Sequence, residues 1–430
     1  MASACKYMMT FAACIAALSS WSEEPPPNIV LLIGDDQAWN DYGFMGHEAI
    51  QTPHLDALAA EGIVYSHGYV VTSLCRPSLA TMATGLYPHQ HGITGNDPKG
   101  PRPKRAALDL PWRTKFETLP RVAELLGEKK GYVSHQSGKW WEGPCMCGGF
   151  TAGMTHGDPE RGGRHGDAGL LIGRETMQPV FDFIDEAGAK PFFIWYAPFL
   201  PHEPHNPPDR LLKKYEAAGR PEELAKYYAM CEWFDETVGQ LVSHIEKRGL
   251  SDRTMYVFLA DNGWIQPTPN RPPAARPSQG APRGKGSPYE GGIRTPFLVQ
   301  WPGHTEHKVV DTPVSSIDIA PTILRAAGLE VPAELPGLDL LDLQAVDARP
   351  AVYGAIFEHD MASPQEPGAT LQWRWMVRGN DKIIAPTGRV EGQTEVFNLA
   401  ADPWEEHDIA AESPDKTEEL TAELNAWWTP

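Results

Sequence analysis

The chain has 430 residues, of which 41% are hydrophobic and 22% are charged, and these proportions are typical of a folded globular protein. Its 56 acidic residues outnumber its 37 basic ones and give a formal net charge of −19, which excludes a nucleic-acid-binding protein that relies on a basic face. The length exceeds that of one ordinary hydrophobic core, so we expect two domains or one large domain with an appendage.

The N-terminal residues 1–20 have the features of a signal peptide, and cleavage as late as residue 24 is also compatible with the pattern. Lys6 precedes a short apolar run that ends at two serines. This run is too short to cross a membrane, and no later segment of the sequence is a transmembrane candidate. The chain around Cys14 loosely resembles a lipoprotein cleavage site, but Phe11 is a poor first residue for that signal. We therefore expect secretion or export to the periplasm rather than a lipid anchor.

Four apolar runs each end in a cluster of polar residues. Helical patterns lie between these runs. The apolar runs are 28–34, 131–136, 191–198 and 254–260, and the helical patterns are 52–62, 118–126 and 221–248. Strands that alternate with helices predict an α/β fold, with a mainly parallel sheet flanked by helices. The binding site of such a sheet lies beyond the carboxyl ends of its strands, which is where the polar clusters fall.

The last part of the chain predicts a smaller unit. A long Pro/Arg-rich loop at about 263–286 is expected near the site, and a helix is expected at 318–327. The segments that follow predict a small α+β subdomain, and they are the short strands 351–357, 373–377, 382–385 and 395–399 and the helix 416–428. The proline- and leucine-bearing connection 332–350 marks the boundary, so we expect a catalytic domain at 27–340 and a C-terminal subdomain at 350–430.

Two of the polar clusters supply oxygen ligands for a metal ion. Asp35 and Asp36 follow the first apolar run, and Asp261 and Asn262 follow the last. Carboxylate and amide oxygens together are the ligands that Ca²⁺ prefers. An Asp-Asp pair on its own is more typical of a turn that caps a helix, but its pairing with Asp-Asn-Gly after a second strand favours a metal site.

Cys75 stands in a small polar turn just before a helix-compatible run in which Pro77 fits the first turn. The start of a helix favours an anion, so a thiol there is predicted to be acidic and reactive; the alternative is a cysteine buried in the core. Cys231 lies on the apolar face of a predicted helix and is interpreted as a core residue. Cys145 and Cys147 are spaced too closely for a typical zinc site, and a disulfide with either remains open.

Six motifs occur in one order along the chain, and together they resemble the type I, formylglycine-dependent sulfatase family of the alkaline-phosphatase-like superfamily. These motifs are Asp35-Asp36, Cys75-Arg76-Pro77-Ser78 with Thr84-Gly85, Gly138-Lys139-Trp140, His202, Asp261-Asn262-Gly263 and Lys285-Gly286-Ser287-Pro288-Tyr289-Glu290-Gly291-Gly292. The segment 396–399 with Asp402-Pro403 is similar to the terminal signature of that family. The resemblance spans about residues 28–410.

The resemblance implies that the chain hydrolyses sulfate esters with formylglycine, made from Cys75 by a formylglycine-generating enzyme. It also implies one Ca²⁺ per chain, which touches the modified Cys75. The other implied ligands are Asp35, Asp36, Asp261 and Asn262. The implied fold is the alkaline-phosphatase-like α/β fold with a small C-terminal subdomain, and the expected substrate is a sulfated small molecule or oligosaccharide.

Four further residues receive roles from the same resemblance. Lys139 and Lys285 are implied to bind sulfate oxygens, and His202 to donate a proton to the leaving alcohol. His205 is a further candidate for contact with the substrate. Ionised groups fixed in place stabilise the negative charge that develops when a sulfate ester is cleaved.

The sequence departs from the family pattern at two positions. Leu79 stands where the family has an arginine four residues after the modified cysteine, and Trp141 stands where it has the histidine that acts as a base. His205, His135 or a water molecule are candidates to replace that base. The departures keep two alternatives open: a phosphonate or phosphodiester hydrolase, and a catalytically silent carbohydrate-binding protein on this scaffold. The loop residues expected to meet anionic groups of a substrate are Arg102, Lys104, Arg105, Arg271, Arg276 and Arg283.

Overall fold

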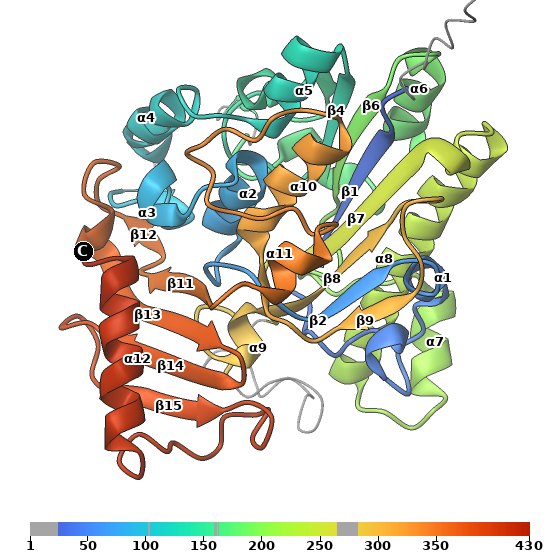
Figure 1. Cartoon of the computed structure of the whole chain (residues 1–430). Coiled ribbons are helices and arrows are strands. Elements are labelled where there is room, and N and C mark those ends of the chain that lie inside the picture. Colours follow the sequence, from blue (N-terminus) through green and yellow to red (C-terminus); the bar gives the residue numbers. More distant parts are fainter. Residues whose placement is uncertain (1–24, 102–103, 159–160, 162, 265–282) are drawn as a thin grey trace, which may run out of the picture.

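A nine-stranded sheet lies between two layers of helices, and a four-stranded sheet packs beside it (Figure 1). The structure is a computed structural model that describes residues 25–101, 104–158, 161, 163–264 and 283–430. It confirms the expected α/β class with a small antiparallel unit at the C-terminus. None of the helices it describes is both long and apolar enough to cross a membrane. The predicted signal peptide lies outside the described residues.

The strands of the large sheet follow the order β10-β2-β8-β7-β1-β6-β4-β5, and β9 pairs with β2. Their bounds are β1 Asn28–Gly34, β2 Ile63–Tyr69, β4 Val133–Gly138, β5 Ala152–Gly153, β6 Phe192–Ala197, β7 Thr254–Ala260, β8 Arg294–Gln300, β9 Lys308–Val310 and β10 Val314–Ser315. The pairs of β1 with β6 and β7, and of β6 with β4, are parallel. The carboxyl ends of these four strands therefore meet at one edge of the sheet.

Alternate residues of the central strand β1 enter two different cores. Ile29, Leu31 and Ile33 pack with the helices of one face, whereas Val30 and Leu32 pack with those of the other. The first face is covered by α2 Cys75–Thr84, α5 Val122–Lys130 and α10 Ile319–Ala326, and the second by α1 Pro53–Ala59, α6 Gln178–Ala187 and α8 Glu222–Lys247. All five of these β1 residues are at most 1% exposed, as a strand covered on both faces requires.

The C-terminal unit is an antiparallel sheet with a helix packed on it. The sheet has the order β11-β13-β14-β15, and Met376, Ile383 and Val396 from its strands pack against Leu420 and Leu424 of the helix. The bounds are β11 Val352–Phe357, β13 Leu371–Arg378, β14 Asp381–Pro386, β15 Glu395–Asn398 and α12 Pro414–Trp427. These elements match the short strands and closing helix predicted from the sequence.

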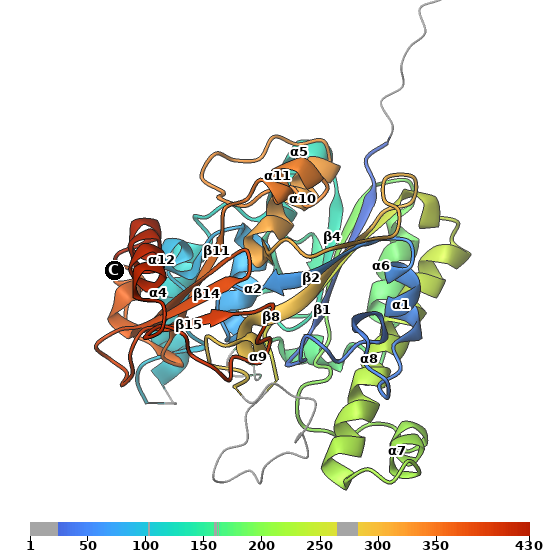
Figure 2. The same cartoon turned by 60° about the horizontal axis from the view of Figure 1, so that its bottom comes forward.

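Several further elements complete the fold. They are α3 Pro88–His91, β3 Asp97–Pro98, α4 Arg105–Phe116, α7 Asp209–Glu216, α9 Glu290–Ile293, α11 Leu343–Asp347 and β12 Asp360–Met361. Figure 2 shows α7 and the start of α8 extending away from the sheet, where Leu211 and Tyr215 pack against Tyr227 and Tyr228. Strands β3 and β12 pair with each other and tie the C-terminal region to the large domain.

Candidate active site

The polar clusters predicted at strand ends meet at the carboxyl edge of the large sheet. Asp35 and Asp36 follow β1, Lys139 follows β4, and Asp261 follows β7. The edge is compact because Gly138 has a φ of 85° and because a Cβ atom there would lie only 1.8 Å from the Ala197 carbonyl oxygen. Only glycine allows this close approach of two strand ends.

The aspartates of this edge are held against each other by direct hydrogen bonds. The Asp36 backbone N–H donates to Asp261 Oδ1 at 3.1 Å, and the Asp261 N–H donates to the Gly34 carbonyl at 2.8 Å. Asn262 Nδ2 donates to Asp36 Oδ1 at 2.7 Å. Asp36 adopts a left-handed φ of 60°, a conformation uncommon outside glycine that aspartate tolerates better than most residues.

Cys75 begins α2 beside these carboxylates, as the sequence predicted. Two lysines converge on its sulfur: Lys139 Nζ lies 3.1 Å and Lys285 Nζ 2.8 Å from Sγ. Lys139 also donates to Asp35 Oδ1 at 2.6 Å, and Lys285 donates to Asp36 Oδ1. The predicted metal ligands, the nucleophile precursor and both predicted sulfate-binding lysines therefore surround one point.

The prediction of an acidic Cys75 thiol is wrong. Burial, together with the charge of Asp261, raises its pKa to about 12 against the opposing effect of the two lysines. The start of a helix favours an anion by only about 0.3–1 kcal/mol, which is too little to offset the loss of hydration. Cys75 is 2% exposed and is not poised as a thiolate in this environment.

Four buried oxygens of the site accept no hydrogen bond among the residues that the structure describes. They are Asp35 Oδ2, Asp36 Oδ2, Asp261 Oδ2 and Asn262 Oδ1. Buried oxygens without partners are costly in a folded protein, and here each predicted ligand contributes one. Ligand atoms of Asp35, Asp36, Cys75 and Asp261 also lie within 4.8 Å of one another. This donor set fits a hard divalent cation such as Ca²⁺.

The charges of the site favour the same cation. Three carboxylates face two ammonium groups, so an excess negative charge is buried at the edge of the sheet. Burial, together with the neighbouring carboxylates, raises the pKa of Asp35 and of Asp261. Burial also raises the pKa of Asp36, but the charges of Lys285 and His202 outweigh it, so that pKa lies below its ordinary value. A divalent cation would relieve the repulsion among these carboxylates.

His202 lies at the rim of this cluster. Its Nε2 is 3.4 Å from Asp36 Oδ2, its Nδ1 lies 2.7 Å from the Glu203 carbonyl, and its ring stacks on Phe199 with centroids 4.2 Å apart. Burial and the charge of Lys139 lower the pKa of His202. An anionic ester beside the ring would raise that pKa and favour the protonated form, which is able to donate a proton.

Trp141 and Leu79 are both buried where the family pattern has polar residues. Leu79 is 4% exposed and packs in the core beneath α2. The Trp141 ring lies 5.4 Å from Lys139 Nζ and contacts the ring of His165 at a centroid distance of 5.4 Å. His165 stacks on Phe199 in turn, at 6.0 Å. Lys139 and His165 thus contact the same two aromatic rings.

His165 and Arg174 are site residues that the sequence interpretation missed. Both stand in the irregular segment between β5 and α6, far in sequence from the motifs. Arg174 donates to the carbonyl oxygens of Phe199 and His202, at 2.6 Å each. No spacing or periodicity marks either residue, so tertiary structure alone brings them to the site.

The other predicted candidates lie at varying distances from this centre. His205 stacks on Trp264 with centroids 5.3 Å apart, and His135 packs against Phe183 of α6. Cys231 is fully buried as expected, and Cys145 and Cys147 are free thiols. Of the predicted basic loop residues, Arg105 lies beside the site, and Arg283 lies over the ring of Tyr289. Arg102, Arg271 and Arg276 lie outside the described residues.

The arrangement of the sheets and helices is the alkaline-phosphatase-like fold. Solved structures with this fold superpose over nearly the whole chain. Ps i-CgsB in complex with a neocarrahexaose has a TM-score of 0.74 at 24% identity and covers 94% of this chain and 92% of its own. A phosphonate monoester hydrolase of Agrobacterium radiobacter has a TM-score of 0.69 at 18% identity, with coverage of 93% and 96%.

The chain belongs to the sulfatase family and is a sulfuric ester hydrolase. The Sulfatase family model matches residues 27–329, and the model of the N-sulphoglucosamine sulphohydrolase C-terminal region matches residues 284–427. Human arylsulfatase A is 32% identical over 370 residues, which is 74% of this chain and 68% of the relative. The ulvan-active sulfatase of Formosa agariphila is 26% identical over 96% of this chain and 83% of its own length.

Proposed function

We propose that the chain hydrolyses sulfate esters of a carbohydrate at the site around Cys75, after conversion of this cysteine to formylglycine and with one Ca²⁺ bound. One observation carries the proposal: four buried oxygens that accept no hydrogen bond from the described residues, one from each predicted oxygen ligand, surround a sulfur that also contacts two lysines. A bound sulfate group would occupy the same place, since its oxygens need cations on several sides.

Each group of the site has a defined task under this proposal. Formylglycine would supply the oxygen nucleophile, and Ca²⁺, held by the four oxygen ligands, would supply charge stabilisation at the sulfate. Lys139 and Lys285 hold their ammonium groups beside the nucleophile position, where they neutralise sulfate oxygens. With an anionic ester bound, His202 would take up a second proton and could donate it from Nε2 to the leaving alcohol.

The substrate class and the location follow from the relatives and from the sequence. The relatives include N-acetylgalactosamine-6-sulfatases and an ulvan-active sulfatase, and one structural neighbour was solved with D-glucosamine-2-N,6-O-disulfate. These names support a sulfated saccharide as the substrate. The predicted signal peptide at residues 1–20 supports secretion or periplasmic export, and a formylglycine-generating enzyme would act on the chain during maturation.

The first experiment determines the chemical state of residue 75. The full chain is co-expressed with a formylglycine-generating enzyme, and the peptide that contains Cys75 is analysed by intact-peptide mass spectrometry. We expect the mass loss of thiol-to-aldehyde conversion together with hydrolysis of 4-nitrophenyl sulfate. Cys75→Ala should abolish the activity. Cys147→Ala, a change at a half-buried thiol away from the site, should not.

The outcomes separate the proposal from its alternatives. If Cys75 remains a thiol under all conditions and no ester is hydrolysed, the chain is a silent carbohydrate-binding member of the family. If converted protein hydrolyses bis(4-nitrophenyl) phosphate or a phenyl phosphonate with a higher kcat/KM than the sulfate, the phosphonate or phosphodiester alternative replaces it. Similar fold alone does not distinguish these chemistries.

A further inference from the structure

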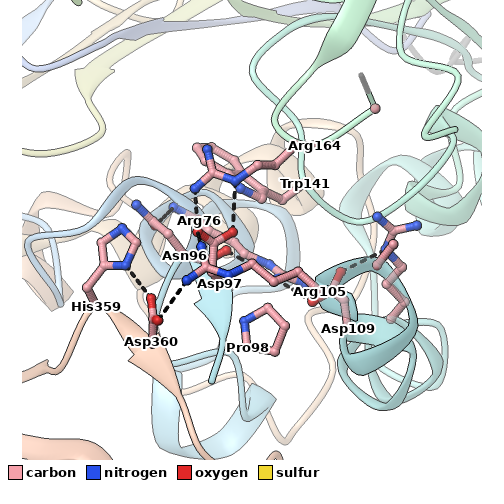
Figure 3. Close-up of a pocket in the computed structure, with 13 residues that line it drawn as sticks. Arg76, Asn96, Asp97, Pro98, Arg105, Asp109, Trp141, Arg164, His359 and Asp360 are labelled. Atoms are coloured by element: carbon pink, nitrogen blue, oxygen red, sulfur yellow. Dashed lines mark hydrogen bonds and ion pairs between the residues drawn. The ribbon is translucent and has the colours of Figure 1, made fainter. Parts of the chain in front are cut away.

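A cavity of about 730 Å³ opens beside the reaction centre and has no role in the chemistry described above. Figure 3 shows its lining, which comes from α4, from strands β3 and β12, and from the segment that carries Arg164. Residues Arg105, Asp109 and Arg113 of α4 contribute, because residues four apart share one face of a helix. The parallel pairing of β3 with β12 places Asp97 opposite Asp360.

Two residues connect this cavity to the reaction centre. Arg76 lines the cavity and directly follows Cys75 in the chain. Trp141 also lines it, and the Trp141 ring lies 5.4 Å from Lys139 Nζ. A molecule with its sulfate between Lys139 and Lys285 would therefore extend past Trp141 into the cavity.

The carboxylate of Asp97 is the centre of a fixed network of hydrogen bonds. Arg164 donates to it through Nε and Nη2, at 2.8 and 2.6 Å, and Arg105 Nη1 donates to it at 2.6 Å. Arg105 Nη2 also donates to Asp360 at 3.0 Å, and His359 Nδ1 lies 2.6 Å from the same carboxylate. Bidentate arginine–carboxylate pairs of this kind fix the direction of their remaining N–H groups.

The charges that line the cavity are balanced. Asp97 and Asp360 neutralise Arg105 and Arg164, as the contacts above show. The buried Arg76 is paired with Glu142 and with Asp109, both at 2.6 Å, and Asp109 also accepts from Arg113 at 2.9 Å. A second sulfate group would find no unpaired cation here, because Arg105 and Arg164 are already paired with these carboxylates. A metal ion at the carboxylates would have to displace the two arginines.

Two donors of the cavity nevertheless lack partners. Arg105 Nε and Trp141 Nε1 are buried and make no hydrogen bond with any residue that the structure describes. The Trp141 side chain is almost completely buried, with 6% of its surface exposed. Unpartnered donors beside fixed carboxylate acceptors suit a ligand group that both donates and accepts, and a hydroxyl group does both.

We propose that this cavity binds an uncharged sugar ring of the substrate through its free hydroxyl groups, with the Arg105–Asp97–Arg164 network as the recognition element. The proposal rests on the proposed function, and it adds a substrate preference: the sugar unit that enters the cavity carries no second anionic group. Paired donors and acceptors at fixed positions match neighbouring hydroxyls of a sugar ring. They disfavour a sulfated or carboxylated unit, because a second anion would lose its hydration and find no unpaired cation in the lining.

The test compares two saccharides that differ by one charge. N-acetylglucosamine 6-sulfate and glucosamine 2-N,6-O-disulfate carry the same 6-sulfate, and 4-nitrophenyl sulfate reports on the reaction centre without a sugar. We expect the converted protein to have about tenfold higher kcat/KM for the monosulfated sugar, as expected for a site that opposes one buried charge. Arg164→Gln should lower the ratio of saccharide to aryl sulfate kcat/KM about tenfold.

Arg164→Gln removes a positive charge from the cavity, and Asp360→Asn makes the opposite change. It removes a negative charge from the cavity, so the preference for the monosulfated sugar should shrink or reverse. Arg210→Gln is the matched control, because Arg210 forms a similar two-nitrogen pair with Glu236 on α7 and α8 and is 61% exposed. It should change none of the three kcat/KM values.

Binding is measured separately, so that the two proposals fail in distinguishable ways. Saturation-transfer NMR of N-acetylglucosamine 6-sulfate is recorded on unconverted Cys75 protein, which lacks the proposed nucleophile. Contacts to the sugar ring protons that weaken in Arg164→Gln support the cavity even if no ester is cleaved. A preference of the wild type for the disulfated sugar would overturn the proposed cavity function. So would equal binding of the sugar by Arg164→Gln and wild type together with equal ratios of saccharide to aryl sulfate kcat/KM.

Discussion

Arg174 holds His202 through the backbone: its Nη2 donates to the His202 carbonyl oxygen at 2.6 Å. The same guanidinium donates to the carbonyls of Phe199 and Pro204 and to Asn206 Oδ1. Its plane lies 5.1 Å from the Phe199 ring, on which His202 stacks. One side chain therefore fixes the whole segment that carries His202.

Arg174→Gln should lower kcat, and the loss should be larger for substrates whose leaving alcohol has a higher pKa. A displacement of about 1 Å at a reacting group costs on the order of 10²-fold in rate. We therefore expect kcat to fall strongly with a sugar sulfate, whose alkoxide needs a proton, and little with 4-nitrophenyl sulfate. The measurement is kcat against leaving-group pKa for a series of aryl and alkyl sulfates. A uniform loss across the series would instead indicate general damage to the fold.

Calcium should stabilise the folded chain even without conversion of Cys75, because the buried oxygens that accept no hydrogen bond would coordinate the ion. At a calcium concentration of 100 times Kd the gain is about 2.7 kcal/mol. We expect Tm to rise by a few degrees on addition of CaCl₂ and to fall on addition of EDTA. Asp261→Asn should remove most of this response. Asp360→Asn should retain it, and loss of the response there would place the ion in the cavity beside Trp141 instead.

The sequence predicted the centre of the site because its chemistry is local to strand ends. A short, wholly apolar run such as 28–34 indicates a buried strand, and the carboxyl edge of a parallel sheet collects whatever follows. These two rules alone place Asp35, Lys139 and Asp261 at one edge of the sheet. The order of the motifs then limited the class of enzyme.

Features that depend on burial and on long-range packing were not predictable in the same way. The prediction of an acidic Cys75 thiol was wrong, because the sequence of the turn does not show how deeply the site is buried. Strand β8 was not predicted, and its antiparallel pairing with β2 and β7 departs from the parallel order of the central strands. The helix α4 was missed because Pro111 interrupts its pattern. Its Arg105 reaches Asp97 and Asp360 only through pairing of β3 with β12.

A buried ion cluster joins the C-terminal sheet to the segment that carries Lys285. Lys382 of β14 is fully buried, and its Nζ lies 2.9 Å from Glu290 of α9 and 2.7 Å from Glu405. Lys382→Met leaves two buried carboxylates without this cation, and the expected loss is about 3–5 kcal/mol in the free energy of unfolding. Urea denaturation measures this loss. Lys416→Met, which removes a partly exposed pair with Asp381, should cost about 1 kcal/mol or less.

Asp235 should make stability depend on pH below neutrality. It accepts from the backbone N–H groups of His54 and Leu55 at the start of α1, and burial raises its pKa from 3.8 to about 7 against these hydrogen bonds. Because the folded pKa exceeds the unfolded one, this contribution to stability is complete below about pH 4. It is lost as pH rises through 7, by up to about 4 kcal/mol at 1.4 kcal/mol per pKa unit.

Asp235→Asn isolates that contribution. The amide cannot ionise, so the difference in unfolding free energy between wild type and variant should change between pH 4 and pH 7 in favour of the variant. Replacement of one acceptor oxygen by an amide nitrogen adds a loss of about 1–3 kcal/mol that does not depend on pH. Asp182→Asn, at an exposed position of α6, should give a flat difference. A flat difference for Asp235→Asn would contradict the prediction.

Position 141 holds a tryptophan in place of the family's histidine, and His165 packs against that tryptophan. Burial and the charges of Arg164 and Lys139 lower the pKa of His165 to about 4, so its ring is neutral at pH 7 and able to accept a proton. Its Nδ1 is buried without a hydrogen bond among the described residues. The ring contacts Trp141 and Phe199, the same two rings that flank Lys139.

His165→Ala should therefore lower kcat by about 10²–10⁴, the usual cost of losing one general base, if this imidazole removes the proton that the family's histidine removes. Trp141→His should restore the activity of His165→Ala, because it returns an imidazole to the family position. The measurement is kcat for 4-nitrophenyl sulfate in the two single variants and the double variant. His165→Phe keeps the aromatic packing and controls for it. Equal losses in His165→Ala with and without Trp141→His would show that His165 only supports the wall of the site.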